Sequence, residues 1–490
     1  MPKITVINKN EKSEITANVG DNLLDILRKN GFYIEAACGG TGSCKKCQVK
    51  SLGVTMLSCQ TTITADMIIE ISSNIGSGLL KSVKKTYDVE KKNGYGIAID
   101  LGTTTLAAYL INLETGEVLD SKSILNAQAS YGADVITRIK KCSEGYLKDL
   151  FSIIRLQFNE IIRGFKKSHQ ILEIETIIVA ANTTMLHILA GVDPTSLGVA
   201  PFTPVFLERL EIPGNDINID AKEVILLPSI SSYLGSDVVA GILACDMASA
   251  AQNIILADIG TNGEIVLKTT NNMYGVSTAA GPAFEGAKIE CGVGGIPGAI
   301  SQVKLENKKL KIETIDNQPV IGICGSGLID IISLLVSEGI IDETGSFDSD
   351  ADSDLNVYLN NDRFYLGDNI YLSQKDIREF QLAKSAIASG IQVLVESANL
   401  KLEDIDKVYL AGGFGFYINQ ENAIHIGLLP KAMKHRIVSV GNTSGLGAKM
   451  ALLNSNYLRE CDKIAKLVCV IELSNNPKFT EYFIDNMLFE

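Results

Sequence analysis

Four cysteines gather near the start of the chain, and their spacing is the strongest chemical signal in the sequence. The stretch ACGGTGSCKKC at 37–47 contains Cys38, Cys44 and Cys47, and Cys59 follows in MLSCQTT. The other six of the ten cysteines are scattered singly. A cluster of this kind in a reducing compartment indicates a metal site rather than a disulfide framework. The scattered cysteines are interpreted as small buried hydrophobic residues.

The metal that these cysteines would hold follows from their spacing. Four thiolates satisfy the ligand requirement of a 2Fe-2S cluster, and the two-residue gap between Cys44 and Cys47 suits two ligands on one turn. The glycines of the first gap permit backbone conformations in which N–H groups point at the sulfurs. The alternative is a structural zinc site, which more often uses two paired C-x2-C knuckles, whereas Cys59 stands alone. The spacing favours the iron–sulfur cluster.

The residues before the cysteine loop predict the fold that carries it. KITVIN and SEITANV read as two strands, and a helix follows with Asp21 and Gly31 as its caps. Together with the cysteine loop, this order resembles the β-grasp ferredoxins, with the five-residue first gap of the adrenodoxin type. The early return to Cys59 departs from that type and implies a trimmed domain at 1–72. The polar, lysine-rich residues 73–94 are predicted to form a linker.

A second chemical signal is a turn that occurs twice. GIAIDLGTTTLAAYLIN and, much later, IILADIGTNGEIVLK each read as an apolar strand, an Asp-x-Gly-Thr turn and a second strand. Glycine lets backbone N–H groups approach phosphate oxygens, threonine adds hydroxyl donors, and an aspartate at the strand end can hold Mg²⁺ through water. The residues concerned are Asp100, Gly102, Thr103 and Thr104 in the first turn, and Asp258, Gly260, Thr261, Asn262, Gly263 and Glu264 in the second.

The repeated turn predicts two related lobes, in an order similar to the actin, sugar-kinase and heat-shock chaperone superfamily. That resemblance implies that the two turns are phosphate loops. It also implies that Gly325, Ser326 and Gly327, in GICGSGLID, form the adenosine side together with Gly412 and Gly413, in VYLAGGFGF. No G-x-x-x-x-G-K-[ST] sequence is present, which disfavours a P-loop fold.

Length, composition and charge set the outer limits of the interpretation. With 490 residues, two to four domains are expected. The fold class is therefore predicted as an α+β β-grasp ferredoxin domain, a short linker and an α/β two-lobed actin-like ATPase body at 95–490, with lobes at approximately 95–250 and 251–490. A net charge of −13 argues against a nucleic-acid partner. The absence of a long apolar run argues against membrane insertion or secretion and favours the cytoplasm.

The combination of head and body resembles a known family, the reductive activators of corrinoid proteins. The resemblance spans nearly the whole chain and includes NAQASYGADVITRI, NTTMLHILAGVDPTSLGVAPF, AGPAFEGAKIECG and SQKDIREFQLAKSAI. It implies ATP-dependent transfer of one electron from the 2Fe-2S cluster to an inactive Co(II) corrinoid, giving the Co(I) state used for methyl transfer. The implied partners are a corrinoid methyl-transfer protein and a low-potential electron donor, and homodimerisation is compatible with the resemblance.

The family resemblance also suggests roles for the carboxylates of the two turns. Asp100 and Asp258 are expected to hold Mg²⁺ and its waters, and Glu264 is expected to orient the attacking water. Positioning and charge would carry hydrolysis, without a covalent intermediate. An ordinary strand-end carboxylate is the alternative interpretation of Glu264.

Three other functions remain open from the sequence. A sugar-kinase-like enzyme would explain the body but leave the cysteine head idle. An iron–sulfur sensor that binds nucleotide without turnover would use both parts. An ATP-dependent activator of another low-potential enzyme, such as a 2-hydroxyacyl-CoA dehydratase, would change only the electron acceptor.

Four further features allow both a functional and a structural interpretation. His187 has apolar neighbours at helical spacing, which favours a core histidine over a catalytic one. Arg378 and Lys384 could contact nucleotide or lie on a solvated helix face. The acidic stretch GSFDSDADSDLN lacks the glycine and glutamate of a calcium loop and is interpreted as a solvated insertion.

Overall fold

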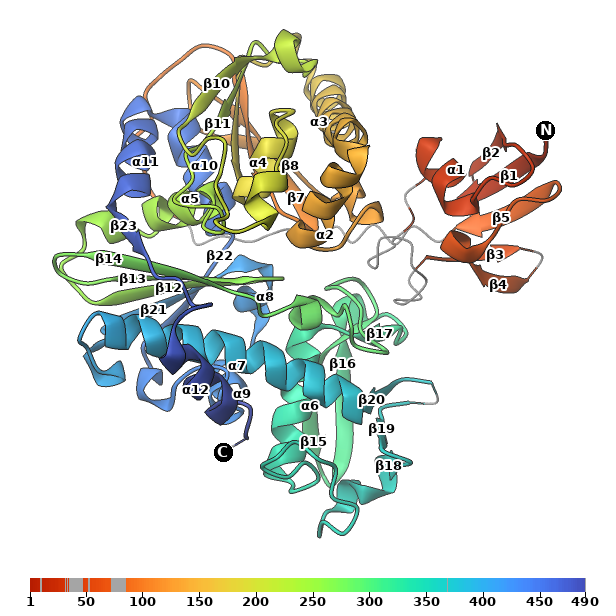
Figure 1. The fold of residues 1–490 in the computed structure, drawn as a ribbon, viewed down its shortest axis with the longest axis vertical. Helices are drawn as coiled ribbons and strands as arrows, with labels where there is room; N and C mark the ends of the chain where they lie inside the picture. Colours follow the sequence, from red (N-terminus) through yellow and green to blue (C-terminus); the bar gives the residue numbers. More distant parts are fainter. Residues whose placement is uncertain are drawn as a thin grey trace.

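The computed structural model describes two units, a small N-terminal sheet domain and a larger two-lobed body (Figure 1). The predicted ligands Cys38 and Cys44 lie outside the described residues, as do residues 73–84 of the predicted linker. The described residues are 1–8, 11–30, 32, 34, 47–51, 53–71, 85–367 and 369–489.

The N-terminal unit is a five-stranded sheet with one helix, in the strand order β2-β1-β5-β3-β4. Its elements are β1 (Lys3–Asn8), β2 (Glu11–Thr16), α1 (Leu23–Lys29), β3 (Gln48–Ser51), β4 (Val54–Leu57) and β5 (Met67–Ile71). The second strand begins and ends earlier than predicted, because Glu11 pairs directly with Asn8 across the hairpin. Parallel pairing of β1 with β5 and the burial of Leu23 and Leu27 close the small core. This arrangement is the expected β-grasp.

The first lobe is built on a six-stranded sheet in the order β10-β11-β9-β6-β7-β8. The central strand β6 runs antiparallel to β7 and parallel to β9. Buried apolar residues dominate β6 and β9, as expected of strands that are covered on both faces. The elements are β6 (Tyr95–Leu101), β7 (Thr105–Asn112), β8 (Val118–Leu125), α2 (Val135–Lys141), α3 (Leu147–His169), β9 (Thr176–Ala181), α4 (Thr183–Leu189), β10 (Leu210–Pro213) and β11 (Glu223–Leu226).

The second lobe repeats this sheet. Its order is β22-β21-β12-β13-β14-β23, and β12 runs antiparallel to β13 and parallel to β21, as β6 does to β7 and β9. The repeat seen in the sequence therefore corresponds to a repeat of strand order and strand direction in the fold. The elements are β12 (Ile254–Ile259), β13 (Gly263–Lys268), β14 (Met273–Thr278), α7 (Gln374–Ser397), β21 (Lys407–Ala411), α8 (Gly412–Tyr417), α9 (Gln420–His425), β22 (Ile437–Gly441), β23 (Val468–Val470) and α12 (Pro477–Asp485).

An insertion between β14 and α7 enlarges the second lobe and extends it downward in Figure 1. It contains two small sheets and a buried helix that packs on β15. The acidic stretch at 345–356 belongs to this insertion, where its side chains are mostly exposed or half-buried. The elements are β15 (Ala299–Glu306), β16 (Lys309–Thr314), β17 (Gly322–Ile323), α6 (Gly325–Ser337), β18 (Leu359–Asn360), β19 (Arg363–Tyr365) and β20 (Tyr371–Ser373).

Two crossing helices join the lobes, α5 (Ser236–Ala244) and α10 (Thr443–Leu453). They approach so closely at Gly447 that a Cβ there would lie 2.1 Å from the Ala240 carbonyl oxygen, so only glycine fits. Both helices contribute to one core that also takes side chains from β6, β9 and β12. After α10 and α11 (Ser455–Leu467) have packed in the first lobe, the chain returns to the second through β23.

The second half of the predicted linker lies against the body. Glu90 donates its backbone N–H to the Leu453 carbonyl, and Tyr87 packs against the core that contains residues of α5 and α10. Lys85 forms an ion pair of 2.6 Å with Asp246. These contacts fix residues 85–94 at the start of β6.

No helix in the described ranges is long and apolar enough to cross a membrane.

Candidate functional site: the paired turns and the cysteine pair

The first turn lies between β6 and β7 and is supported from behind. Asn126 donates its side-chain amide to the Gly102 carbonyl at 2.9 Å, and its backbone N–H bonds the Thr104 carbonyl at 2.8 Å. The buried Arg138 guanidinium bonds the Thr103 carbonyl. With the carbonyls engaged on one side, the peptide N–H groups face the other. Those of Thr103 and Thr104 donate to no acceptor in the described part of the protein.

The second turn occupies the equivalent position between β12 and β13. Gly260 donates its N–H to the Asn262 carbonyl at 2.9 Å, which closes the turn. The backbone N–H groups of Thr261 and Asn262 have no acceptor among the described residues. Each turn therefore presents two consecutive free N–H groups, the arrangement that cradles anions.

The aspartates of the two turns have different surroundings. Asp100 accepts hydrogen bonds from the Asn442 amide and the Ser444 hydroxyl, both at 2.8 Å, at the start of α10. Asp258 accepts no hydrogen bond within the described ranges, and its carboxylate faces Gly412, where a Cβ would lie 2.6 Å from Oδ1. The structure thus holds one aspartate firmly and leaves the other available to a ligand.

A third aspartate, Asp237 in the first turn of α5, lies beside these two. Burial is the main cause that raises the pKa of Asp258 to about 7, and the charges of Asp237 and Asp100 add to it. Burial likewise raises the pKa of Asp237 to about 7. Burial also raises the pKa of Asp100, although its two donors oppose the shift. Crowded carboxylates of this kind favour the arrival of a cation.

Glu264 stands directly opposite Asp258 in the β12–β13 pair. Burial, together with the charges of Asp237 and Asp258, raises the pKa of Glu264 well above its usual range. No three His, Cys, Asp or Glu side chains of the described chain converge as a complete metal site. Mg²⁺ commonly takes only one or two carboxylates together with waters and phosphates, so the residues present fit it.

A carboxylate that the sequence did not single out connects the two turns. Glu285, at the end of a short 3₁₀ helix (Pro282–Glu285), accepts hydrogen bonds on its Oε2 from both threonine hydroxyls. The Thr104 Oγ1 lies 2.9 Å away and the Thr261 Oγ1 lies 2.6 Å away. One oxygen atom thereby bridges the first lobe and the second.

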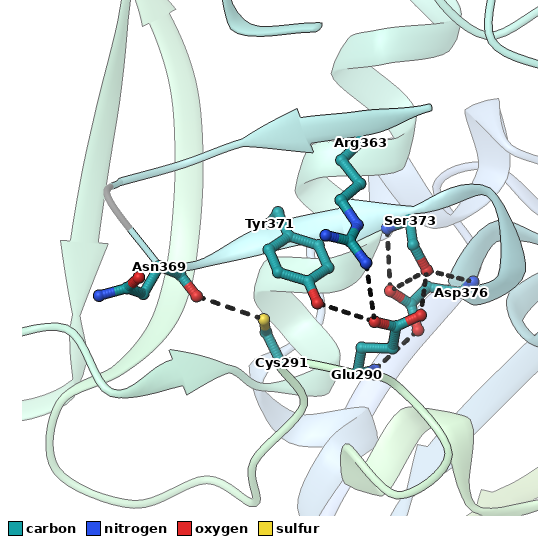
Figure 2. A network of polar contacts seen from close by, with 7 residues as sticks. All are labelled: Glu290, Cys291, Arg363, Asn369, Tyr371, Ser373 and Asp376. Atoms are coloured by element: carbon teal, nitrogen blue, oxygen red, sulfur yellow. Dashed lines mark hydrogen bonds and ion pairs between the residues drawn. The ribbon is translucent and has the colours of Figure 1, made fainter. Parts of the chain in front are cut away.

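The segment that carries Glu285 is fixed beyond it by the polar network of Figure 2. Glu290 accepts hydrogen bonds from the Tyr371 hydroxyl at 2.8 Å and the Ser373 hydroxyl at 3.2 Å. Its backbone N–H donates to the buried Asp376 at 2.8 Å. The Tyr371 hydrogen bond is the main cause that lowers the pKa of Glu290, and nearby Arg363 adds to it. The network joins this segment to β19, β20 and the first turn of α7.

The glycines predicted for the adenosine side lie at the starts of two helices that contact each other. Gly325, Ser326 and Gly327 open α6, and the Ser326 hydroxyl donates to the Ser301 carbonyl at 3.0 Å. A Cβ at Gly327 would lie 2.2 Å from the Ile300 carbonyl oxygen, so this glycine is needed for close packing on β15. Helix α6 contacts α8, which begins at Gly412 and Gly413.

Two of the four predicted cluster ligands are described, and they lie together. The sulfur atoms of Cys47 and Cys59 are 3.1 Å apart, and both side chains are buried and free of a disulfide. Converging buried thiols fit the donor set of an iron–sulfur cluster. Nothing is stated of Cys38 and Cys44, which lie outside the described residues.

Three side chains with two possible roles have structural partners. His187 is buried, with its Nδ1 2.8 Å from the Thr183 carbonyl, and accepts the Val205 N–H on Nε2, as expected of a core histidine. Lys384 is buried and donates to the carbonyls of Asn486 and Leu488, which anchors the C-terminal segment. Arg378 bonds the Thr344 carbonyl and the Gln381 side chain.

Several residues of the site were missed because their types are common and their contacts are distant in sequence. The clearest available signal was GNTSGLGA at 441–448, a run of small residues that starts α10. A second was the LGSDVVAGILA stretch that forms α5. The missed residues are Asn126, Arg138, Asp237, Glu285, Asn442 and Ser444.

The fold and the site define a class of protein, a β-grasp cysteine domain joined to a two-lobed body whose equivalent aspartate turns face each other. The 2Fe-2S iron–sulfur cluster binding domain matches residues 6–70. A model described as the RACo middle region matches residues 95–250, and one described as the C-terminal domain of RACo, the ASKHA domain, matches 252–490.

Similarity to individual proteins extends over the whole chain. The corrinoid activation enzyme RamQ of Eubacterium limosum is 30% identical over 581 residues, covering 98% of both chains. The [Co(II) methylated amine-specific corrinoid protein] reductase of Methanosarcina barkeri is 26% identical, covering 80% of this chain and 76% of its own. A solved structure of a reductive activator for a corrinoid, iron–sulfur protein is 28% identical with a TM-score of 0.74, covering 99% of this chain and 98% of its own. The chain belongs to the family of reductive activators of corrinoid proteins.

Proposed function

We propose that this protein is an ATP-dependent reductive activator that passes one electron from a 2Fe-2S cluster to a corrinoid protein. The acceptor would be an inactive Co(II) corrinoid, which returns to the Co(I) state used for methyl transfer. The observation that carries the proposal is the presence, on one chain that aligns end to end with a corrinoid activation enzyme, of both the cysteine domain and the paired aspartate turns.

Cys38, Cys44, Cys47 and Cys59 are proposed as the cluster ligands. The pair described in the structure supports this assignment, because two buried thiols already lie 3.1 Å apart at the end of the β-grasp sheet. When bound, the cluster supplies a one-electron carrier of low potential. The protein's part is to provide the thiolates and to bury them.

The nucleotide is proposed to lie between the two turns. The free N–H groups of both turns would bind its phosphates, and Asp258 and Asp100 would hold Mg²⁺ and its waters. Bound Mg²⁺ supplies charge neutralisation for phosphoryl transfer.

Glu264 is proposed to orient the attacking water. Its opposition to Asp258 in the β12–β13 pair supports this role. The turn residues are Gly102, Thr103, Thr104, Gly260, Thr261, Asn262 and Gly263, and those of the adenosine side are Gly325, Ser326, Gly327, Gly412 and Gly413.

We expect ATP to be required because the electron would move energetically uphill. Many 2Fe-2S centres lie near about −400 mV, and we expect Co(II) in a corrinoid protein to be harder to reduce. Each ~59 mV of unfavourable difference lowers a one-electron equilibrium constant tenfold. Nucleotide can offset this only if two arrangements of the lobes differ in their affinity for the partner or in the cobalt environment that they impose. The crossing of α5 and α10, where the lobes share a core, is the structural element suited to such a difference.

The remaining assignments follow from this activity. The domain division proposed is a ferredoxin-like domain at 1–72, a linker at 73–94 and a body at 95–490 with lobes near 95–250 and 251–490. The matched ranges 6–70, 95–250 and 252–490 support it. A low-potential donor, a cytoplasmic location and a homodimer are also proposed. Eight described cysteines that form no disulfide support a reducing compartment.

The decisive experiment follows the visible spectrum of a Co(II) corrinoid methyl-transfer protein under anaerobic conditions. The activator, reduced by a low-potential donor, is added with and without MgATP. We expect the Co(I) band only when ATP and an intact set of four cysteines are both present. A Cys142→Ser variant controls for cysteine replacement outside the cluster.

Two other outcomes are informative. If the cluster is reduced and ATP is hydrolysed while the corrinoid spectrum stays unchanged, the redox ATPase stands and another acceptor, such as a 2-hydroxyacyl-CoA dehydratase, must be sought. If ATP is bound without turnover even when the corrinoid partner is present, the protein is a nucleotide-binding sensor and the proposal fails.

A further inference from the structure

Glu285 accepts the two hydroxyl hydrogen bonds that a bound phosphate would otherwise accept. A threonine hydroxyl has one proton to donate, and both Thr104 and Thr261 donate theirs to the same Glu285 oxygen. The second carboxylate oxygen faces Gly260, where a Cβ would lie 3.6 Å from it. The carboxylate therefore sits between the two turns, next to their free N–H groups, where an anionic phosphate is proposed to bind.

Glu285 is one of several carboxylates at the site. Its charge adds to burial and to the charges of Asp237 and Asp100 in raising the pKa of Asp258. Like charges repel each other. The hydrogen bonds from the Thr104 and Thr261 hydroxyls, at 2.9 and 2.6 Å, hold the half-buried Glu285 side chain between the turns against this repulsion.

The backbone that carries Glu285 is well anchored. Phe284 is buried and packs edge-on against Phe380 of α7, with 5.7 Å between ring centroids. A Cβ at Gly286 would lie 2.2 Å from the Val293 carbonyl oxygen, so the chain turns tightly after Glu285. Farther along, the network of Figure 2 fixes Glu290 to Tyr371 and Asp376. Rotation of the glutamate side chain, without melting of the segment, is enough to free the threonines.

We propose that Glu285 is an internal substitute for a nucleotide phosphate. It ties the two turns together when the site is empty, and it must release Thr104 and Thr261 before phosphate can bind. This inference rests on the proposed function of the turns. It makes Glu285 a positioning residue that sets nucleotide affinity and links site occupancy to the contact between the lobes.

The test compares the dissociation constant of MgATP for the full-length, cluster-containing wild type and for Glu285→Gln, by anaerobic titration calorimetry. The glutamine keeps the size of the side chain but removes its charge. We expect MgATP to bind about tenfold more tightly to the variant, because a weaker and uncharged competitor is displaced. Glu306→Gln, an exposed residue paired with Lys311 in the same lobe, removes the same charge elsewhere and is expected to leave the affinity unchanged.

The effect of Glu285→Gln on MgATP affinity is also measured in a background that lacks both threonine hydroxyls. General destabilisation would not make this effect depend on the threonines. If Thr104 and Thr261 mediate the competition, Glu285→Gln has no effect on affinity in a Thr104→Val, Thr261→Val background. If the glutamine variant does not fold, Glu285→Asp gives the second test, because it keeps the charge but is too short to reach both threonines. It is expected to bind MgATP more tightly than wild type, and an unchanged or weaker affinity would overturn the inference.

The outcomes separate this inference from the proposed function. If wild-type protein binds no MgATP, the phosphate role of the turns is wrong, and the inference falls with it. If wild type binds MgATP but Glu285→Gln binds it equally or more weakly, only the substitute role is overturned. A large loss of turnover with unchanged affinity would instead make Glu285 a catalytic residue, and would also overturn the inference.

Discussion

The two aspartate turns occupy equivalent places in equivalent sheets, yet the protein treats their carboxylates differently. Asp100 receives two hydrogen bonds of 2.8 Å from α10, whereas Asp258 receives none in the described chain. Two side chains, Asn126 and Arg138, also support the first turn from behind. The two sheets have the same topology and therefore form similar turns. The turns differ because side chains from other segments form hydrogen bonds with the first turn and its aspartate. One turn is fixed by the protein, and the other is left for the ligand.

The largest predicted effect comes from removing the free carboxylate. Asp258→Asn is expected to lower Mg²⁺-dependent ATP turnover by roughly 10²–10³-fold, the usual cost of losing one charge-stabilising group. Asp100→Asn should cost about tenfold less, because an amide can still accept a hydrogen bond from Asn442 or Ser444. Steady-state turnover at saturating MgATP measures both. Equal losses would mean that the two turns are functionally equivalent, which would break the comparison.

The next prediction concerns Ser444→Ala, which removes one of the two hydrogen bonds to Asp100. Ser444→Ala leaves the half-buried Asp100 with one donor fewer, which should destabilise the protein by about 1–3 kcal/mol. The free energy of unfolding in urea measures this cost. We also expect a several-fold weaker apparent affinity for Mg²⁺, since Asp100 can then rotate. Ser455→Ala, at the start of α11, is a matched control because its side chain does not reach the turn. A Ser444→Ala variant of unchanged stability and Mg²⁺ affinity would show that the hold on Asp100 is unimportant.

A smaller effect is expected at the glycine that faces Asp258. Gly412 has a φ of 83°, which other residues rarely adopt, and a Cβ there would lie 2.6 Å from the carboxylate. Gly412→Ala should cost about 1–2 kcal/mol of stability and push Asp258 aside. The melting temperature and the Mg²⁺ dependence of turnover are the measurements. Gly339→Ala has a similar φ of 70° but open space around it, so it separates backbone strain from the contact with Asp258. If both variants lose turnover equally, the contact has no role.

The last prediction is a pH dependence that differs between the lobes. In the fold, the pKa of Asp258 is raised to about 7, so between its ordinary value near 3.8 and pH 7 the native state binds more protons than the unfolded one. Its contribution to the free energy of unfolding therefore falls as pH rises through this range. His187, in the first lobe, acts in the opposite sense, because burial lowers its pKa and its contribution is lost as pH falls below 6.5.

Urea unfolding of nucleotide-free protein at several pH values checks these signs. Wild type should lose stability relative to Asp258→Asn between pH 4 and 7. It should lose stability relative to His187→Gln below pH 6.5. Parallel curves for either pair would mean that the residue does not titrate as its burial implies.

The sequence was informative where chemistry lies in short contiguous stretches. The β-grasp opening, the duplicated strand and turn, and the family were all predicted correctly, because Asp-x-Gly-Thr after an apolar strand constrains both backbone and charge. The contacts that distinguish the two turns were not predictable in this way. Asn442 and Glu285 reach the turns from distant segments, and serine, asparagine and glutamate are common at helix starts and on surfaces. The roles assigned to the turn residues remain predictions.

The position of α10 in the chain has a consequence for biosynthesis. The donors that hold Asp100 are 342 and 344 residues downstream of it, and the core that the first lobe shares with the second includes Leu446 and Leu452. A ribosome releases segments in order, and domains generally fold as they emerge. The first lobe is therefore translated long before the helix that completes it. A growing chain cannot assemble this site until almost its last helix has left the exit tunnel, so truncated products would not sequester ATP.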